Sequence, residues 1–269
     1  IGGGPAGSAA AITLAKSGRS VAVFDKAKFP RDKCCGDGLT TLALRLSETL
    51  GLMPSEIKNW KDVNEAILHW GDSRSALCAL PDSPGIYAAV VPRFDYDQAL
   101  LNIALASGAS IYQGHGLESI SIKSDKAIMS IDGLGMVEAN SVIAADGMWS
   151  PTRRLLGLSI DSYRGEWHAF RQYFKNVSPT ADKLHVWFEP DLLPGYVWSF
   201  PLSGRRANIG FGVLRGGQIS INETGKIWKD LLSRPKIREV IGDEFESEGR
   251  HTAWPIPARV NSIPLSHGP

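Results

Sequence analysis

Three glycines near the amino end of the chain have the spacing of a phosphate-binding turn. Gly2, Gly4 and Gly7 match G-x-G-x-x-G, with Pro5 and Ala6 between the last two. The first glycine permits a tight bend, the second lets the backbone approach a diphosphate, and the third lets a helix pack closely on a strand. Because ordinary structural turns also contain such trios, the interpretation depends on the flanking elements.

The segments after the glycine turn are those of a dinucleotide-binding unit. Residues 8–17 predict an alanine-rich helix that ends at Gly18, and residues 20–24 predict a short buried parallel strand. Asp25 closes this strand 18 positions after Gly7, near the spacing expected for an acid that holds ribose hydroxyls. Unsatisfied N–H groups at the helix start favour phosphate. Together these features predict a bound dinucleotide, without separating FAD from NAD.

A second acid follows another predicted strand. Residues 141–145 are typical of a buried strand, and they lead into Asp146 and Gly147. Ser150 and Pro151 then predict the start of a short helix, as its cap and its first residue. The acid could bind ribose or face the diphosphate, but Asp-Gly is also a common turn pair. Both interpretations remain open at this point.

Aromatic residues gather on strands predicted beyond residue 161. Tyr196, Trp198 and Phe200 alternate along one strand, so their side chains share a face, and Pro201 follows them. For any one residue, a sheet face packed on helices is the simpler interpretation. As a group, they could wall a long apolar channel. The same set includes Trp187, Phe188 and Phe211.

The remaining segments predict an α/β fold with two interleaved parts. Turn residues and apolar patterns separate a nucleotide-binding α/β part from a mostly antiparallel part. We expect helices at residues 41–50, 95–107 and 222–241, and strands at 65–70, 75–80, 87–91, 184–188, 196–200 and 207–213.

Composition and charge exclude several classes of function. The 29 basic and 28 acidic residues give a net charge of +1, which does not favour nucleic acid as a partner. The six histidines show neither metal-ligand spacing nor a hydrolase triad, so we expect no metal. Three cysteines are too few for a disulfide framework, which favours a cytoplasmic setting. No apolar run approaches the roughly 20 residues that span a bilayer, so any membrane contact would be peripheral.

Four cations lie in the polar loop after Asp25. Lys26, Lys28, Arg31 and Lys33 would form an ordinary solvated face in the simplest interpretation. Arg31 could instead reach a cofactor phosphate, and the lysines could meet anionic lipid headgroups.

Several motifs together resemble a known superfamily. The glycine turn, Val91-x-Arg93 before a helix, and Ala145-Asp146-Gly147 resemble the para-hydroxybenzoate-hydroxylase-like flavoproteins. Within them, Lys-Cys-Cys-Gly-Asp-Gly-Leu at 33–39 and Pro-Gly-Tyr-Val-Trp-Ser-Phe-Pro at 194–201 resemble the two signatures of the geranylgeranyl reductase family. Residues 184–201 and 253–258 further resemble its menaquinone side-chain reductase branch. The match covers nearly the whole chain in the expected order.

The resemblance implies a Rossmann-like FAD-binding domain interleaved with an antiparallel substrate domain. It places FAD-binding parts at residues 1–60 and 91–160, substrate parts at 61–90 and 161–258, and a returning FAD-binding segment at 259–269. A further family signature, Gly-Asp-Ala, would begin just after Pro269, so we expect the FAD-binding domain to be incomplete at both ends of this sequence.

The resemblance also assigns site residues. Arg93 would contact the flavin cofactor, and Asp146 would contact the region between FAD and a nicotinamide donor. The loop from Cys35 to Gly38 would lie beside the isoalloxazine ring. Substrate-binding residues would be Tyr196, Trp198, Phe200 and Pro201, which would line a lipid pocket. The predicted cofactor-binding residues are Gly2, Gly4, Pro5, Ala6, Gly7, Asp25, Lys26, Arg31, Cys35, Gly36, Gly38, Arg93, Asp146 and Gly147.

Cys35 and Asp37 are the candidate catalytic residues. Saturation of a carbon–carbon double bond needs a hydride from reduced flavin and a proton from an acid. The Cys35 thiol could supply or relay that proton, since two glycines beside it would let a flat ligand come close. The simpler interpretation is a small buried residue. Asp37 and bound water are competing donors, and Cys34 is interpreted as structural.

The expected function is therefore an FAD-dependent oxidoreductase that reduces isolated double bonds of a prenyl chain. Substrate candidates are a geranylgeranyl lipid or diphosphate and a menaquinone side chain, with NAD(P)H as the expected electron donor. A flavin monooxygenase or halogenase on the same scaffold is the first alternative. A non-catalytic flavin- or lipid-binding protein is the second.

Overall fold

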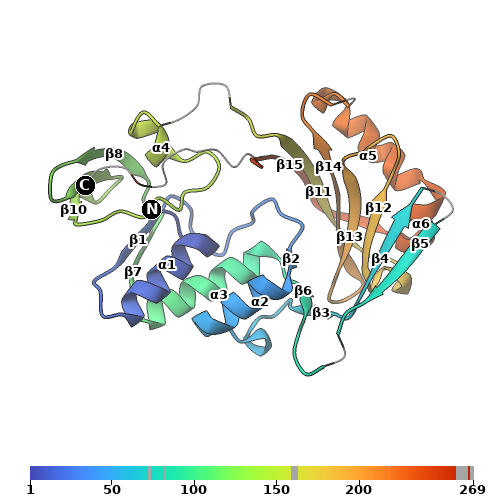
Figure 1. Ribbon diagram of the computed structural model, residues 1–269, viewed down its shortest axis with the longest axis horizontal. Helices are drawn as coiled ribbons and strands as arrows, with labels where there is room; N and C mark the ends of the chain where they lie inside the picture. The colour runs from blue at the N-terminus through green and yellow to red at the C-terminus, as the bar shows by residue number, and fades with distance from the viewer. Residues whose placement is uncertain (72–73, 82, 159–162, 218, 259–265, 267–269) are drawn as a thin grey trace.

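The computed structural model describes residues 1–269 except 72–73, 82, 159–162, 218, 259–265 and 267–269. A group of helices and small sheets lies on one side of the molecule, and one large sheet with two helices lies on the other (Figure 1). No helix in the described ranges is both long and apolar enough to cross a membrane. The predicted segment 259–269 lies, apart from Ser266, outside the described residues, and the predicted domain boundaries stay a prediction.

The predicted dinucleotide-binding unit forms at the amino end. Helix α1 (Pro5–Lys16) follows the glycine turn, and strand β1 (Ala22–Asp25) pairs in parallel with β7 (Ser110–Gln113). Helix α3 (Arg93–Ala106) packs on α1, where Ala11, Ile12, Leu100 and Ala104 share a buried cluster. Small side chains on α1 let the two helices approach closely. The predicted helix, strand and acid are confirmed.

Two three-stranded sheets and several short helices surround this unit. Helix α2 (Thr41–Leu50) is capped by Thr40, whose side chain accepts a hydrogen bond from the Ala43 N–H at 3.4 Å, and it ends at Gly51 as predicted. A three-stranded sheet contains β2 (Gly38–Leu39), β6 (Ala88–Val90) and β3 (Lys61–Val63), in that order. Another contains β10 (Gly135–Ala139), β9 (Ala127–Ile131) and β8 (Leu117–Ile122). Short helices are η1 (Pro54–Glu56) and α4 (Pro151–Leu155).

The large sheet has seven strands. Their order is β15 (Glu246–Ile256), β11 (Trp167–Lys175), β14 (Arg206–Leu214), β13 (Tyr196–Leu202), β12 (Leu184–Phe188), β4 (Glu65–Trp70) and β5 (Arg74–Ala79). All neighbouring pairs are antiparallel except β12 and β4, which are parallel. The mostly antiparallel second part is therefore confirmed.

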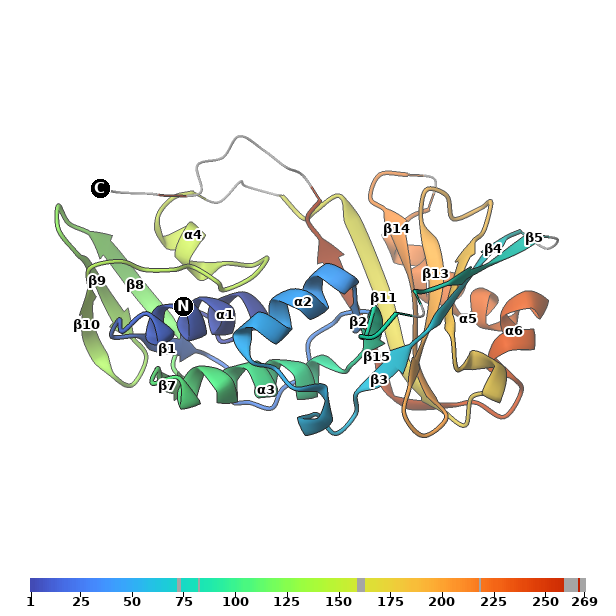
Figure 2. The ribbon, with the colours of Figure 1, turned by 60° about the horizontal axis from the view of Figure 1, so that its bottom comes forward.

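Two helices cover one face of the large sheet, and its other face turns toward the amino-terminal part (Figures 1 and 2). Helices α5 (Thr224–Ser233) and α6 (Pro235–Ile241) follow η3 (Ile221–Glu223), and η2 (Pro179–Ala181) precedes β12. Under these helices lies the largest apolar core, which includes Trp187, Phe211 and Trp228. Trp187 and Phe211 therefore pack in this core and not on the face that carries Tyr196.

One predicted strand is absent. Residues 141–145 form no strand and are exposed or half-buried, although the sequence indicated a buried strand. The backbone of this segment exchanges hydrogen bonds with Ile1: the Ile1 amino group donates to Ile143 O, and Ala145 N–H donates to Ile1 O, both at 2.8 Å. Since one residue is too short a partner for a ladder, the apolar run lies beside the glycine turn without joining a sheet.

Candidate functional site

Packing requires glycine at two positions of the glycine turn and leaves space at the third. A Cβ atom on Gly2 would lie 2.4 Å from the Ala145 carbonyl oxygen, and one on Gly7 would lie 1.8 Å from the Gly2 oxygen. At Gly4 the nearest atoms to such a Cβ are guanidinium nitrogens of Arg31 and Arg93, at 3.5 and 3.9 Å. The start of α1 thus faces two cations across an open space, which is the arrangement that binds an anion.

Asp97 holds these two arginines in place. Its fully buried carboxylate accepts hydrogen bonds from Arg31 Nη1 at 2.8 Å and from Arg93 Nε and Nη2 at 2.6 and 2.7 Å. Burial lowers the pKa of Arg93, but the contacts with Asp97 and with the Cys35 side chain outweigh it, so the pKa rises. Arg93 therefore stays charged beside the glycine turn. Asp97 was not predicted from the sequence, although an acid four residues after Arg93 on a helix was a usable signal.

Asp25 closes the other side of the turn. Its carboxylate accepts hydrogen bonds from Gly3 N–H at 2.7 Å and from Ala27 N–H at 2.8 Å. Each oxygen keeps a second lone pair, which a ribose hydroxyl could use. The turn, the helix start, the two cations and this acid therefore fit an adenine dinucleotide. Lys26 is exposed and its Cβ lies beside Gly116, so its cofactor contact stays a prediction.

Asp146 lies next to the glycine turn but already has a structural role. Its Cα would be 3.1 Å from a Cβ on Gly2, and its Oδ2 accepts a hydrogen bond from Thr152 N–H at 2.9 Å. The carboxylate thus caps α4 together with Ser150, whose Oγ accepts from Arg153 N–H at 3.0 Å. The predicted helix start is confirmed. The predicted cofactor contacts of Asp146 and Gly147 stay predictions.

Residues 33–38, here called the cysteine loop, are tied to the large sheet by Asp37. This residue is 2% exposed and has a left-handed backbone with φ of 65°. Its Oδ2 accepts hydrogen bonds from Tyr173 Oη at 2.6 Å and from Asn208 Nδ2 at 2.8 Å, and its Oδ1 accepts from Arg93 N–H at 3.3 Å. Asn208 Nδ2 also donates to Cys35 O at 2.8 Å. Because both carboxylate oxygens already have partners, the geometry supports a positioning residue more than a proton donor.

Burial raises the pKa of Asp37 to about 6, although hydrogen bonds from Tyr173 and Asn208 oppose the rise. The pKa of this carboxyl is higher in the folded state than in the unfolded state, so its protonated form stabilises the fold. The stabilisation is complete below the unfolded pKa and is lost as the pH rises through about 6. Because the ordinary pKa of an aspartate side chain is 3.8, the loss would be about 3 kcal/mol. Unfolding by urea at pH 4 and pH 7.5 measures it. We expect Asp37→Asn to flatten this pH dependence.

Asp182→Asn is the matched control, because the Asp182 side chain is 62% exposed. Wild type and the control should lose the same free energy of unfolding between the two pH values. Parallel pH profiles for Asp37→Asn and wild type would contradict a proton held by Asp37.

Two further contacts hold the cysteine loop and Asp32, the residue before it, on the sheet. The buried Arg171 donates from Nη2 to both carboxylate oxygens of Asp32, at 2.6 and 2.7 Å, and lies over the Tyr173 ring at 4.2 Å. The Lys33 ammonium lies 3.6 Å from the centre of the Trp254 ring. Burial, with repulsion from nearby arginines, lowers the pKa of Lys33. Lys33 therefore packs inward, although its simplest interpretation from the sequence was a solvated cation.

A cavity of about 490 Å³ lies between the cysteine loop and the open face of the large sheet. Its volume is in the range of small-molecule sites, and five of the residues that line it are aromatic. The predicted Tyr196, Trp198 and Phe200 all line it, as do Cys34, Cys35, Gly36, Trp167, Ala169, Arg171, Gly212, Trp254 and Ile256. A Cβ on Gly38 would lie 3.2 Å from the Phe200 ring, so this glycine lets the loop approach the wall.

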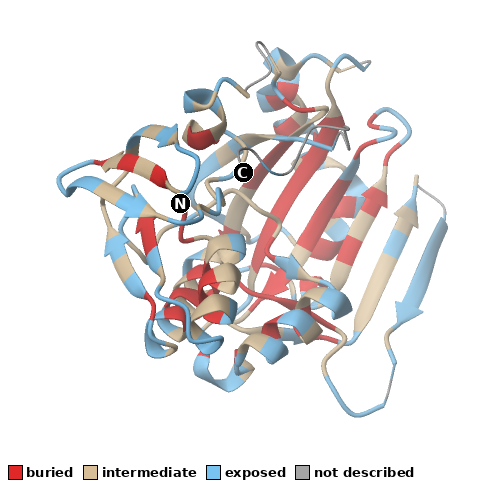
Figure 3. Ribbon diagram, turned by 60° about the vertical axis from the view of Figure 1, so that its left-hand side comes forward, coloured by how far each residue is buried: buried red, intermediate tan, exposed pale blue. Residues whose placement is uncertain are grey.

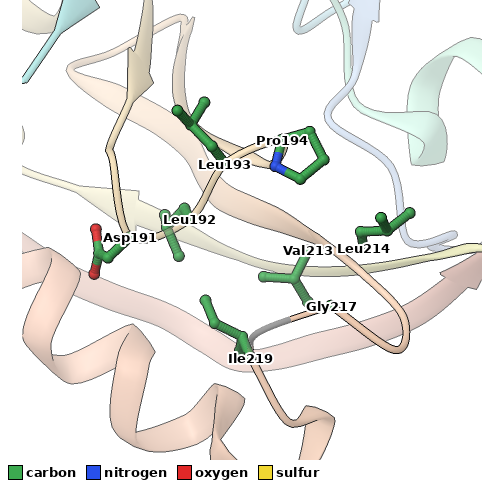
Figure 4. A pocket seen from close by; sticks show the side chains of 8 residues that line it. All are labelled: Asp191, Leu192, Leu193, Pro194, Val213, Leu214, Gly217 and Ile219. Atoms are coloured by element: carbon green, nitrogen blue, oxygen red, sulfur yellow. The ribbon is translucent and has the colours of Figure 1, made fainter.

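Pro201 does not line this cavity. Alternation along β13 turns Pro201 to the opposite face, where it is buried and pairs with Ala207 of the core under α5 and α6. Three of the four predicted wall residues therefore border the cavity, and their contact with a substrate stays a prediction. A second hollow, near the turn that contains Leu192 and Pro194, has a volume of about 10 Å³ (Figure 4). That volume holds at most about one water molecule.

Cys35 lies where the cation pair and the cavity meet. Its side chain is near enough to the Arg93 guanidinium to raise the pKa of that group, and it is part of the cavity wall. The neighbouring Cys34 lies 3.9 Å from the Thr252 carbonyl oxygen, and burial raises its pKa. Both thiols are free. The structure thus brings Cys35, Arg93 and the glycine turn together as the sequence indicated.

Comparison with known proteins identifies relatives of this chain. A family model described as "FAD binding domain" matches residues 1–205. The chain is 33% identical over its full length to the menaquinone reductase of Mycobacterium tuberculosis H37Rv. It is 28% identical, over 98% of its length, to digeranylgeranylglycerophospholipid reductase 2 of Methanopyrus kandleri. The chain spans 64% of the length of each of these two proteins.

Solved structures show the same fold. A geranylgeranyl bacteriochlorophyll reductase-like protein of Thermoplasma acidophilum is similar with a TM-score of 0.78 and 22% identity, over 94% of this chain and 64% of that one. A halogenase in complex with FAD has a TM-score of 0.77, also at 22% identity, over 95% of this chain and 59% of that one. At this identity the likeness concerns the fold and not the reaction. The match to the family model over most of the chain, together with the geometry of the glycine turn, shows that the chain belongs to the FAD-binding domain family.

Proposed function

We propose that this protein is an FAD-dependent reductase that saturates isolated double bonds in the prenyl chain of a lipid or quinone. The observation that carries the proposal is the position of Cys35 between a dinucleotide-binding turn and a cavity walled by aromatic rings. A reductase of this kind needs a redox cofactor, an apolar site for the alkene and a proton donor, and this arrangement provides a place for each. The names of the two relatives support the same class of substrate.

The residues of the chain divide this task. FAD, once reduced, supplies the hydride that one alkene carbon accepts. Tyr196, Trp198 and Phe200 would orient the prenyl chain and exclude water from it. The Cys35 thiol would give its proton to the other alkene carbon, and the Arg93 guanidinium would stabilise the resulting thiolate until solvent returns the proton. Asp37 would keep the loop in place. NAD(P)H is the proposed source of electrons for the flavin.

Anaerobic turnover tests the proposal. The full-length protein, with its flavin reduced, is mixed with menaquinone, geranylgeranyl diphosphate or a geranylgeranyl ether lipid, and products are weighed by mass spectrometry. We expect each saturated bond to add the mass of two hydrogen atoms without oxygen present. Turnover that requires oxygen would indicate a monooxygenase or halogenase. Lipid binding without turnover would indicate a binding protein.

We further propose that the protein meets the membrane surface only peripherally, because a prenyl lipid must leave the bilayer to enter the cavity. Sedimentation with lipid vesicles measures this contact. Binding that high salt releases would support a peripheral contact, and protein that only detergent extracts would contradict it.

A further inference from the structure

Aromatic rings continue from the cavity across the large sheet to its outer strands. Ring centres of Trp198 and Tyr196 are 6.1 Å apart, those of Tyr196 and Phe188 are 6.2 Å apart, and those of Phe188 and Trp70 are 5.9 Å apart. The register explains this row, because Phe188 of β12 pairs with Trp70 of β4, and paired side chains share a face. We call Tyr196, Phe188 and Trp70 the aromatic track.

The aromatic track is open to solvent. Trp70 is 46% exposed and Tyr196 is 41% exposed, and Leu68 beside them is also exposed. Helices α5 and α6 cover the opposite face of the sheet, and the outer strands β4 and β5 extend beyond the amino-terminal part (Figures 1 and 3). A contiguous strip of exposed aromatic side chains that begins at a ligand cavity indicates a binding surface more than chance exposure.

The two ends of the cavity differ in the groups that surround them. At the opposite wall, the Lys33 ammonium covers the Trp254 ring, which places a charge on that side. Toward β12 and β4, the rings of the track contact one another, and Arg74 of β5 pairs with Trp70 at the outer end of the track. An apolar chain that leaves the cavity over Tyr196 would therefore stay in contact with apolar surface.

A cavity of this size accommodates a drug-sized molecule, and a prenyl chain of many isoprene units is longer. The excess length would expose apolar area to water unless a surface covers it, at a cost of about 25 cal/mol for each Å². We propose that the aromatic track binds the isoprene units that extend beyond the cavity, and that it makes the protein selective for long prenyl chains. The inference rests on the proposed function and adds a chain-length preference to it.

A chain-length series tests this inference on the full-length protein. The substrates share one quinone head and carry short, intermediate or long prenyl chains. Trp70→Ala removes the outermost ring of the track without touching the cavity wall. We expect KM for the long-chain substrate to rise about ten-fold, because a contact of about 1.4 kcal/mol is lost. KM for the short-chain substrate, kcat and flavin content should stay unchanged, and Trp70→Phe should restore most of the long-chain affinity.

Leu77→Ala is the matched control. Leu77 is 59% exposed on β5 of the same hairpin, but it pairs with Ile67 and lies on the opposite face of the sheet. The same rise in KM for Leu77→Ala, an equal rise for all chain lengths, or no rise for any length would overturn the inference. An equal rise with a lower melting temperature would show that another part of the protein covers the track. If the wild-type protein reduces no prenyl substrate, the proposed function itself is wrong. If the wild-type protein reduces short-chain substrates normally and Trp70→Ala shows no chain-length effect, only the present inference is wrong.

Discussion

Replacement of Cys35 by alanine in the full-length protein is expected to slow reduction of the prenyl substrate by about 10²–10⁴-fold, the usual contribution of a general acid. Reduction of the bound flavin should keep its rate, because that half-reaction needs no proton from this thiol. The reason is geometric: Cys35 forms part of the cavity wall and interacts with the Arg93 guanidinium. Stopped-flow absorbance of the flavin measures both half-reactions separately.

Cys34→Ala is the matched control for this prediction. Cys34 also borders the cavity, but its thiol points to the Thr252 carbonyl, so the variant removes a neighbouring sulfur of different orientation. We expect much smaller slowing of substrate reduction in this variant. If Cys35→Ala slows both half-reactions equally, the residue shapes the cofactor site and is not a proton donor. If it slows neither, the proton comes from water or from Asp37.

The dinucleotide-binding unit was predictable because its signals are local. The glycine turn, the helix after it, the strand and Asp25 lie within 25 consecutive residues, and each follows from residue type and periodicity. The exposed run 141–145 shows the limit of the same reasoning. An apolar segment predicts a buried strand only where the chain supplies neighbouring strands, and here Ile1 alone provides backbone partners among the described residues.

Two strands of the large sheet were not predicted. In β11, aromatic residues occur on both faces, and Arg171 and Tyr173 stand where alternation would suggest solvent. These polar groups are placed by the cysteine loop, more than 130 residues earlier in the sequence. In β15, an edge strand, most side chains are exposed and mixed in character, so no period-two pattern arises. Pairing with β11 positions this strand, and the sequence carries no local signal of that pairing.

The candidate site also contains some residues that could be predicted from the sequence and others that could not. Cys35, Arg93 and the wall residues of β13 could be named from motifs and alternation. Asn208 could not, because a single amide in an apolar strand has many interpretations until its partners are known. The sequence suggested Asp37 as a competing proton donor, whereas the folded chain surrounds its carboxylate with three hydrogen-bond donors. A role in positioning therefore emerges only from tertiary contacts.

Gly212 belongs to no motif of the sequence, yet it lines the cavity. A Cβ atom at this position would meet only the His168 carbonyl oxygen, at 4.0 Å, so the space above it is open. Gly212 pairs with Tyr196 and Ala169 inside the sheet, where a β-branched residue is well tolerated. Gly212→Val should therefore narrow the cavity without disturbing the strand.

The graded series Gly212→Ala, Gly212→Val and Gly212→Leu is expected to lower kcat/KM for prenyl substrates stepwise. One methylene group in an apolar pocket changes this ratio by about 10–200-fold, so valine should remove most of the activity. Flavin content and the rate of flavin reduction should match wild type, because the substitution lies on the sheet and not on the glycine turn. Gly225→Ala, on α5 with open space around it, is the control for loss of a glycine. Equal activity across the series would show that the prenyl chain binds elsewhere, while flavin loss at valine would show that this part of the cavity lining supports the cofactor.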